Sequence, residues 1–209
     1  MGVGLRTFLH TGLFAIAHDA MHGSLLPQFP SVNRRFGQLA LGLYGCLSYD
    51  TCRRLHWKHH CFATEARDPD FHESKGASSI LSACRWYLKF VATYISSRQL
   101  VSIAAGIVSI GMVAIVAELS LQSLVMFWLL PWCLSSVQLF FFGTYLPHHS
   151  RSDNALSGGA RSYYYHEFWS LLACYHFGYH GEHHAYPDIP WYLLPQAIKF
   201  EGPSFGIRK

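Results

Sequence analysis

Histidines are concentrated in three short clusters of this 209-residue sequence, which contains 14 of them. The clusters are HDAMH at residues 18–22, HWKHH at 56–60 and HGEHH at 180–184, the last preceded by His176. Side chains three or four positions apart lie on the same face of a helix. Each cluster is therefore predicted to present two or three imidazoles in one direction, with His176 extending the last helical stripe by one turn.

Imidazole nitrogen binds zinc, copper, iron and nickel, whereas magnesium and calcium prefer oxygen ligands. One catalytic zinc takes about three protein ligands and one structural zinc about four. The clusters hold more imidazoles than one such ion binds, so the sequence predicts two metal ions, each with an open position for oxygen. The six cysteines show no CxxC spacing and are expected to be small apolar residues, not a disulfide framework or an iron–sulfur site.

The composition indicates a membrane protein. Hydrophobic residues make up 51% of the chain and charged residues only 13%, whereas soluble domains average about 25% charged residues. The net charge of +4 is too small to indicate nucleic-acid binding. No basic tract has the interleaved aromatic residues of a nucleic-acid site, so we expect no nucleic-acid partner.

Two long segments lack formal charges, residues 99–117 and residues 119–147. Each is long enough to cross the hydrocarbon core of a bilayer as a helix, at about 1.5 Å per residue. They are predicted to form a transmembrane hairpin with Glu118 near its turn. Pro131, inside the second segment, is expected to be a kink or a helix boundary.

The three clusters can meet only if the chain crosses the membrane an even number of times between them. The hairpin supplies two crossings between the second and third clusters. Residues 36–52, between the first two clusters, are apolar but contain three glycines, and we expect a re-entrant or interfacial segment. The basic residues expected beside the metal would then lie on the cytoplasmic side, as the positive-inside rule favours: Arg34, Arg35, Arg53, Arg54, Lys58, Arg151 and Arg161.

The first cluster ends an apolar segment that begins almost at residue 1. This segment lacks the small-residue cleavage site of a signal peptide. We expect residues 1–209 to form a single membrane domain, and we expect a further transmembrane segment, absent from this sequence, to precede the first cluster.

Three histidine boxes in this order around an apolar hairpin resemble the membrane fatty-acid desaturase and hydroxylase superfamily, whose boxes are HxxxH or HxxxxH, HxxHH and HxxHH. Further passages, HDAMHGSL, ARDPDFH, FFFGTYLPH and FWSLLACYHFGYHGEHHAYPDIPWYLLP, are similar to the β-carotene 4-ketolases of bacteria and algae. The resemblance implies an all-α integral membrane protein. Its transmembrane helices and cytoplasmic or interfacial helices would carry a histidine-rich di-metal site.

The same resemblance implies two non-haem iron ions, O2 as co-substrate and an external electron donor, often ferredoxin. The substrate would be β-carotene taken from the bilayer lipids, with C4 of its β-ionone ring oxidised to a ketone through an alcohol and a gem-diol. A ring methylene has no acidic or basic group, so the metal must supply the oxidant while the protein positions the substrate. The aromatic residues expected to line the substrate path are Phe140, Phe141, Phe142, Tyr145 and Trp191.

By this resemblance nine histidines are expected to bind the irons: His18, His22, His56, His59, His60, His148, His180, His183 and His184. Metal-bound histidines usually donate their second N–H to a carboxylate or a carbonyl. The candidates for that role are Asp19, Asp68, Asp70, Glu167 and Glu182. His176 is a candidate either as a ligand or as a residue that supports one.

Other functions remain open. A carotenoid 3-hydroxylase or a fatty-acid desaturase or hydroxylase would carry the same boxes, and only the flanking passages favour a ketolase. A membrane haem protein needs about two axial ligands per haem, whereas HxxHH places three histidines on one face. A metal transporter usually places its ligands near mid-membrane, whereas these histidines lie at the ends of the apolar segments.

Overall fold

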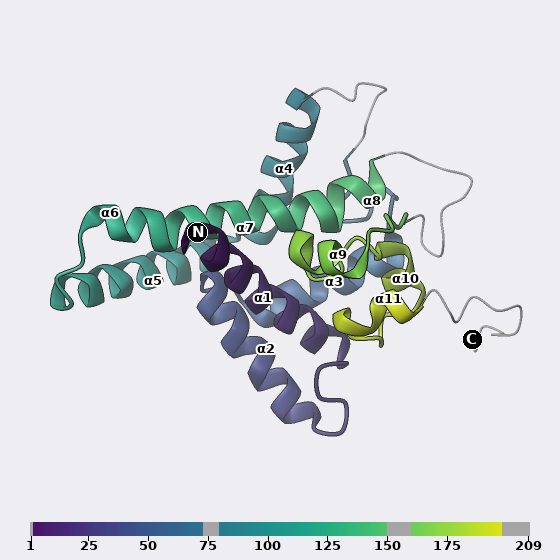
Figure 1. The fold of residues 1–209 in the computed structure, drawn as a ribbon, viewed down its shortest axis with the longest axis horizontal. Coiled ribbons are helices and arrows are strands. Elements are labelled where there is room, and N and C mark those ends of the chain that lie inside the picture. The colour runs from purple at the N-terminus through teal and green to yellow at the C-terminus, as the bar shows by residue number, and fades with distance from the viewer. Residues whose placement is uncertain (1, 73–79, 150–159, 198–209) are drawn as a thin grey trace, which may run out of the picture.

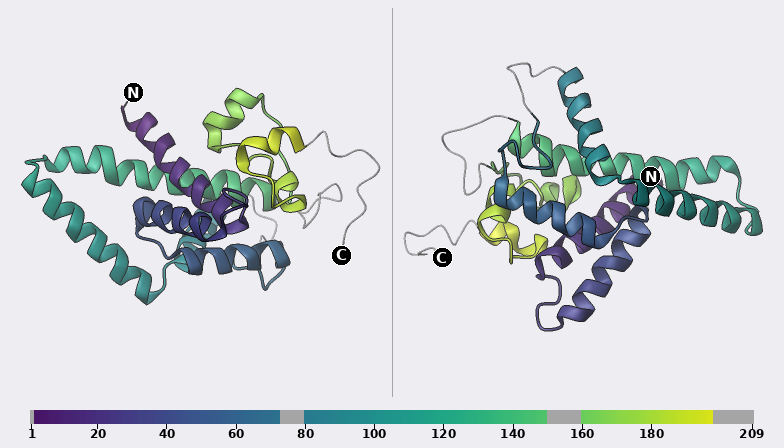
Figure 2. Two further views of the ribbon diagram at one scale, coloured as in Figure 1. Left: turned by 90° about the horizontal axis from the view of Figure 1, so that it is seen from below. Right: turned by 180° about the vertical axis from the view of Figure 1, so that it is seen from behind.

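The computed structural model describes residues 2–72, 80–149 and 160–197, and the regular structure of these residues is entirely helical (Figure 1). Two helices are long and apolar enough to cross a membrane, Ser97–Val116 and Leu121–His148. Figure 2 shows them as a hairpin that extends away from the rest of the molecule. Their apolar side chains are mostly exposed, as expected for helices surrounded by lipid. The described residues thus confirm the predicted all-α fold and hairpin.

The hairpin turn and its second helix follow the sequence in most respects. Helix α5 covers Ser97–Val116, and Glu118 lies in the turn with a φ of 53°. The second helix is continuous but includes two π-helical turns, Val125–Leu129 and Phe141–Tyr145. Its remaining parts are α6 (Leu121–Leu124), α7 (Leu130–Phe140) and α8 (Leu146–His148).

The sequence predicts a kink or a helix boundary at Pro131. The helix does not end there, but its π turn changes to α-helix at Leu130, directly before the proline. A proline has no N–H for the carbonyl four residues earlier, and its ring crowds that carbonyl. The helix widens into a π turn just before Pro131, and the carbonyl oxygen of Phe127 accepts a hydrogen bond from Nε of Arg6 at 3.1 Å instead. Helix α1 thus supplies the donor that the proline lacks.

Helices α1 (Gly2–His22) and α2 (Pro30–Gly45) pack side by side, and α3 (Tyr49–Phe62) follows after a tight turn. Cys46 ends α2 in the left-handed conformation, and the Ser48 hydroxyl accepts from the N–H of Thr51 to start α3. The apolar segment 36–52 is therefore divided between two helices and is not one continuous helix; its interfacial or re-entrant placement stays a prediction.

A close approach of backbones joins these three helices. Gly37 of α2 lies against the Tyr49 ring and Ala20, where an added Cβ would be 2.3 Å from Cε2 of Tyr49. The Tyr49 hydroxyl and the Asn33 amide both donate to the carbonyl oxygen of Ala20, at 2.6 and 2.8 Å. These contacts fix the end of α1, which carries the first histidine cluster.

The remaining helical elements are α4 (Ile80–Tyr94), α9 (Glu167–Cys174), α10 (His180–Ala185), a 3-10 turn at Trp191–Leu193 and α11 (Leu194–Ala197). Apart from α4, which projects to one side, they gather near α8, the last part of the second hairpin helix (Figure 1). Helix α7 crosses α1, where the Thr11 hydroxyl bonds to Ser135 and Gln138. All three histidine clusters consequently lie at one end of the molecule.

Candidate metal centre

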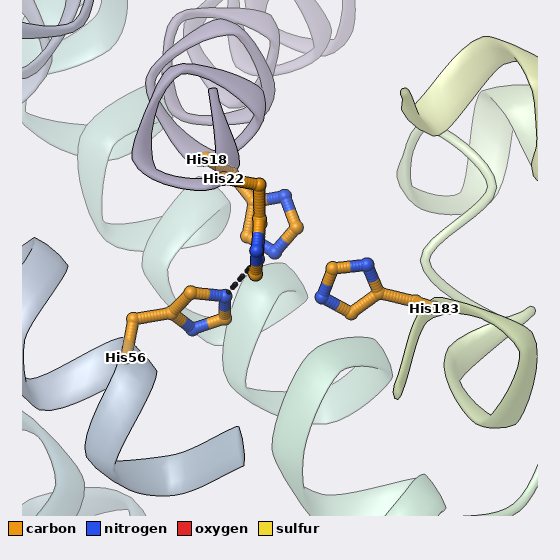
Figure 3. Close-up of side chains that lie close together, drawn as sticks. All are labelled: His18, His22, His56 and His183. Atoms are coloured by element: carbon orange, nitrogen blue, oxygen red, sulfur yellow. Dashed lines mark hydrogen bonds between the residues drawn. The ribbon is translucent and has the colours of Figure 1, made fainter. Parts of the chain in front are cut away.

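One group of histidines combines all three clusters. His18 and His22 come from the end of α1, His56 from α3 and His183 from α10, and one ring nitrogen of each lies within 4.8 Å of the others. Figure 3 shows the four rings converging on one point. The Nε2 atoms of His22 and His56 are 2.7 Å apart.

A second group lies beside the first. It consists of His59 from α3, His148 from the end of the hairpin, and His180 and His184 from α10. The Nε2 atom of His184 is 3.1 Å from the Nε2 atoms of both His59 and His180. His148 is half-buried and packs against His59 and His180, and neither of its ring nitrogens has a hydrogen-bond partner within the described residues.

His60 lies between the two groups. Its Nε2 atom is 3.0 Å from Nε2 of His183 and 3.2 Å from Nε2 of His56 in the first group. Its ring stacks on His184 of the second group, with centroids 4.2 Å apart. The structure thus brings all nine histidines expected as ligands into one cluster with two centres.

Asp68 holds the ring of His59. Its carboxylate accepts a hydrogen bond from Nδ1 of His59 at 3.0 Å, and it also accepts from the backbone N–H groups of Thr64 and Asp70. Because Nδ1 carries the proton of this hydrogen bond, Nε2 of His59 has a free lone pair, and this lone pair is directed toward His184. Burial lowers the pKa of His59, but the hydrogen bond to Asp68 and the nearby carboxylates raise it more, so its pKa lies above the usual value.

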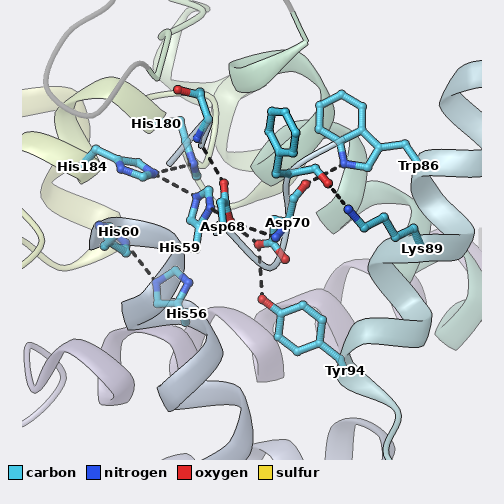
Figure 4. A network of polar contacts seen from close by, with 12 residues as sticks. His56, His59, His60, Asp68, Asp70, Trp86, Lys89, Tyr94, His180 and His184 are labelled. Atoms are coloured by element: carbon cyan, nitrogen blue, oxygen red, sulfur yellow. Dashed lines mark hydrogen bonds and ion pairs between the residues drawn. The ribbon is translucent and has the colours of Figure 1, made fainter. Parts of the chain in front are cut away.

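Asp70 belongs to the same network (Figure 4). Its Oδ2 atom is 3.8 Å from Nδ1 of His59 and accepts from the Tyr94 hydroxyl at 3.2 Å. Trp86 donates to its backbone carbonyl at 2.8 Å. Burial raises the pKa of Asp70 to about 6, and the smaller effect of the neighbouring His59 acts in the opposite direction by lowering it. Helix α4 therefore supports the second histidine group, which sequence reasoning did not foresee.

The other candidate carboxylates do not hold a ligand ring. Asp19 accepts from the backbone N–H of Trp191 at 3.2 Å, and its nearest oxygen is 3.6 Å from Nδ1 of His18. Glu182 accepts hydrogen bonds from Ser162 and Tyr164, and so ties the chain before α9 to α10. Glu167 is exposed at the start of α9.

His176 lies outside both groups. Helix α10 begins at His180, and His176 has a φ of 61° in the turn before it. The prediction of one continuous helical stripe was therefore wrong for this residue. Its ring stacks on Trp191, with centroids 6.1 Å apart.

The nitrogen set fits two cations. Two imidazole nitrogens bound to one ion at about 2.1 Å lie about 3.0 Å apart at octahedral angles and about 3.4 Å apart at tetrahedral angles. The Nε2 atoms here are spaced by 2.7–3.2 Å, close to the octahedral value. Burial lowers the pKa values of His56, His180, His183 and His184, with their neighbouring histidines adding to the effect. Neutral imidazoles offer the lone pairs that a metal ion needs.

A cavity of about 130 Å³ opens beside both groups. Five of the nine histidines form part of its wall, namely His18, His56, His59, His180 and His183. The rest of the wall is mostly apolar and comes from several helices, including α4, α5 and α7. An apolar cavity that ends on candidate metal ligands is the arrangement of a site for an apolar substrate.

The aromatic residues of this cavity differ from those expected. Its wall includes Phe14, Tyr44, Phe90, Tyr94, Trp132 and Phe177. None of the five aromatics expected along the substrate path is part of that wall. Phe140 instead packs against Trp86 and Phe90, and Trp191 against Tyr175.

These features define a helical membrane protein with a histidine-rich candidate metal site beside an apolar cavity. A family model described as "Fatty acid desaturase" matches residues 1–201, and the chain belongs to this family. No solved structure matches the chain significantly.

Curated relatives share most of the chain. A β-carotene ketolase of Paracoccus sp. (strain PC1) is 40% identical over 94% of this chain and 77% of its own length. A zeaxanthin 4-ketolase of Chlamydomonas reinhardtii is 35% identical over 91% of this chain and 42% of its own length. A β-carotene ketolase of Haematococcus lacustris is 34% identical over 93% of this chain and 60% of its own length.

Proposed function

We propose that the protein is a carotenoid ketolase that oxidises C4 of the β-ionone ring of β-carotene to a ketone with O2. The observation that carries the proposal is the apolar cavity whose wall includes histidines of both groups. The three relatives named above, two β-carotene ketolases and a zeaxanthin 4-ketolase, support the substrate class.

The nine histidines would hold two iron ions, which supply the oxidant when bound. Their buried and mostly neutral rings provide the ligands, and Asp68 fixes the orientation of His59. Each of two oxidations consumes one O2, two electrons and two protons, inserts one oxygen atom into a C–H bond at C4 and releases one water. The second gives a gem-diol, which loses a further water to form the ketone.

The cavity wall would position the ring and exclude water. Phe14, Phe90 and Trp132 offer apolar surfaces to a trimethylcyclohexene ring, while the polyene would extend toward the lipid between the exposed apolar helices. Substrate entry from the bilayer fits the exposure of α5 and of the helix Leu121–His148.

The electrons would come from a soluble donor, which we propose to be ferredoxin on the cytoplasmic side. The exposed residues Arg53, Arg54 and Lys58 of α3 form a basic surface for an acidic protein. Trp57, on the same helix, has its ring 5.1 Å from that of His22 and 5.9 Å from that of His60. This ring would shorten the path for electrons from that surface to the histidine cluster.

Expression in a bacterial host that makes β-carotene tests the function. We expect ketocarotenoids, which absorb at longer wavelength, from the wild-type protein and none from His183→Ala. Zeaxanthin as the product would identify a 3-hydroxylase instead, and unchanged β-carotene with iron-loaded protein would contradict carotenoid oxidation. Iron analysis of the purified protein tests the metal, and a Soret band would indicate haem.

A further inference from the structure

The hydroxyl group of Thr144 is unpaired on the wall of the cavity. Thr144 is only 4% exposed and is one of four residues on that wall with a hydroxyl group. The other three are paired, since Tyr94 donates to Asp70, Ser136 bonds to Tyr87, and Tyr44 accepts from Ser135.

The lack of a partner is unusual for a helical threonine. Threonine hydroxyls in helices commonly donate to the carbonyl oxygen four residues earlier, as Thr7, Thr11 and Thr93 do in this chain at 2.9–3.0 Å. Thr144 makes no such bond in the described structure. Its oxygen is also not among the unpaired atoms that the protein fully encloses, so it keeps some accessible surface, and Thr144 is part of the cavity wall.

The backbone places this hydroxyl close to the second histidine group. Thr144 lies in the π turn Phe141–Tyr145, a feature often found at functional sites. It precedes His148 by one helical turn, and residues four apart share a helix face. Gly143 next to it also forms part of the wall and has no side chain to fill the space.

We propose that Thr144 is a specificity-determining residue that retains the ring alcohol between the two oxidations. The inference rests on the proposed ketolase function. The first oxidation produces a secondary alcohol at C4, and an alcohol in an apolar cavity needs a hydrogen-bond partner there. The Thr144 hydroxyl provides one, because it can both donate and accept. The retained alcohol is then oxidised again before it escapes into the bilayer.

Product analysis in the carotenoid-producing host is the first test. Thr144→Val keeps the shape of the side chain and removes the hydroxyl, so the 4-hydroxy product should accumulate and its ratio to ketone rise on the order of tenfold, the factor that corresponds to one hydrogen bond. Thr144→Ser should restore the wild-type ratio. Thr93→Val, which also removes a helical threonine hydroxyl but lies outside the cavity wall, should leave the ratio unchanged.

Binding to the metal-free protein gives a second, independent measurement. Quenching of tryptophan fluorescence by 4-hydroxy-β-ionone and by β-ionone reports on the cavity, because Trp132 is part of its wall. The wild-type preference for the hydroxylated ring should fall about tenfold in Thr144→Val and persist in Thr144→Ser.

The outcomes separate this inference from the function on which it rests. A wild-type protein that forms no ketone overturns the proposed function itself. A wild-type protein that forms ketone, with the same alcohol-to-ketone ratio in Thr144→Val, overturns only the role of Thr144. If Thr144→Val forms no pigment product, the binding measurement decides, since unchanged preference for the hydroxylated ring overturns the role and a lost preference supports it.

Discussion

At the scale of single residues, the pair of His59 and Asp68 shows how the protein prepares a ligand. Both side chains are almost fully buried, and the carboxylate is held in turn by two backbone N–H groups. A buried carboxylate that accepts several hydrogen bonds keeps its place. Its hydrogen bond raises the pKa of the His59 imidazole, and the fixed position keeps Nε2 directed at the second group.

Replacement of Asp68 should therefore weaken metal binding without removing a ligand. We expect Asp68→Asn to lower iron affinity by about 10- to 100-fold, the usual effect of losing such a partner. Iron content after dialysis against a graded series of chelator concentrations measures this. Glu65→Gln removes an exposed carboxylate that, within the described residues, pairs with Arg67 alone, and it should retain wild-type iron content. Equal retention in both variants would contradict the role of Asp68.

Acid should destabilise the metal-free protein. Burial lowers the pKa values of five histidines in the cluster, so folding favours their neutral form. These are His56, His60, His180, His183 and His184. Groups with lowered pKa contribute fully above their unfolded pKa of about 6.5 and lose that contribution as the pH falls below it. His59 and Asp70 have raised pKa values and act in the opposite sense, but they are fewer.

Thermal unfolding of the metal-free protein in detergent micelles measures this dependence. We expect a melting temperature that is nearly constant from about pH 8 to 7 and falls steadily below about pH 6.5. Substitution of His180 and His184 by glutamine should reduce the fall of the melting temperature below about pH 6.5. A melting temperature that rises on acidification would show that the imidazoles are not kept neutral by the fold.

At the scale of helices, the sequence predicts what depends on local periodicity. The hairpin, the spacing within each histidine cluster and the position of Glu118 follow from charge-free length and helical repeat. The way in which the second histidine cluster divides between the two groups does not follow from these features. His59 and His60 are adjacent, and because successive residues diverge by about 100° around a helix, His59 joins one group while His60 faces the other.

Other differences depend on contacts far apart in the chain. The left-handed turn at Tyr175 and His176 separates α9 from α10, and no glycine or proline occupies those two positions to predict it. The π turn before Pro131 depends on its fit to α1 through Arg6. Which aromatic residues face the cavity depends on how each helix is rotated, which the run of residues 140–142 does not specify.

The junction of α1, α2 and α3 gives a prediction at this scale. Gly37→Ala places a methyl group within 2.3 Å of the Tyr49 ring and 2.8 Å of the Ala20 side chain. We expect a loss of about 1–3 kcal/mol in stability from this overpacking, together with reduced iron retention because the end of α1 must shift. Gly42→Ala on the same helix meets nothing within 4 Å and should be neutral or stabilise the helix by up to about 1 kcal/mol. Thermal unfolding in detergent micelles measures the stability of both variants. Equal melting temperatures for Gly37→Ala and Gly42→Ala would contradict the tight packing inferred at Gly37.

At the scale of the whole molecule, the arrangement separates two environments. The hairpin exposes apolar side chains along both helices, while α10, which carries the third histidine cluster, lies at the end opposite the hairpin turn (Figure 1). The basic residues Arg34, Arg53 and Arg54 are exposed on α2 and α3, and Arg34 and Arg53 lie beside Met21 and His22 of the first cluster; Arg151 lies outside the described residues. By the positive-inside rule, these charges favour a cytoplasmic location for the end of the molecule that carries the histidine cluster. The hairpin turn, residues 117–120, would then lie across the membrane from it.

Labelling of single cysteines in cells can test this orientation. Cys61 is exposed at the end of α3, next to His60, and Leu119 is 50% exposed in the hairpin turn. In a protein with the other five cysteines replaced by alanine, Cys61 should react with a charged, membrane-impermeant maleimide only after spheroplasts are broken. With Cys61 also replaced, Leu119→Cys should react in intact spheroplasts, because the helix Ser97–Val116 spans about 30 Å and carries the turn to the far side. Reaction of both cysteines from the same side would show that the hairpin does not cross the bilayer and would contradict the predicted transmembrane arrangement of its two helices.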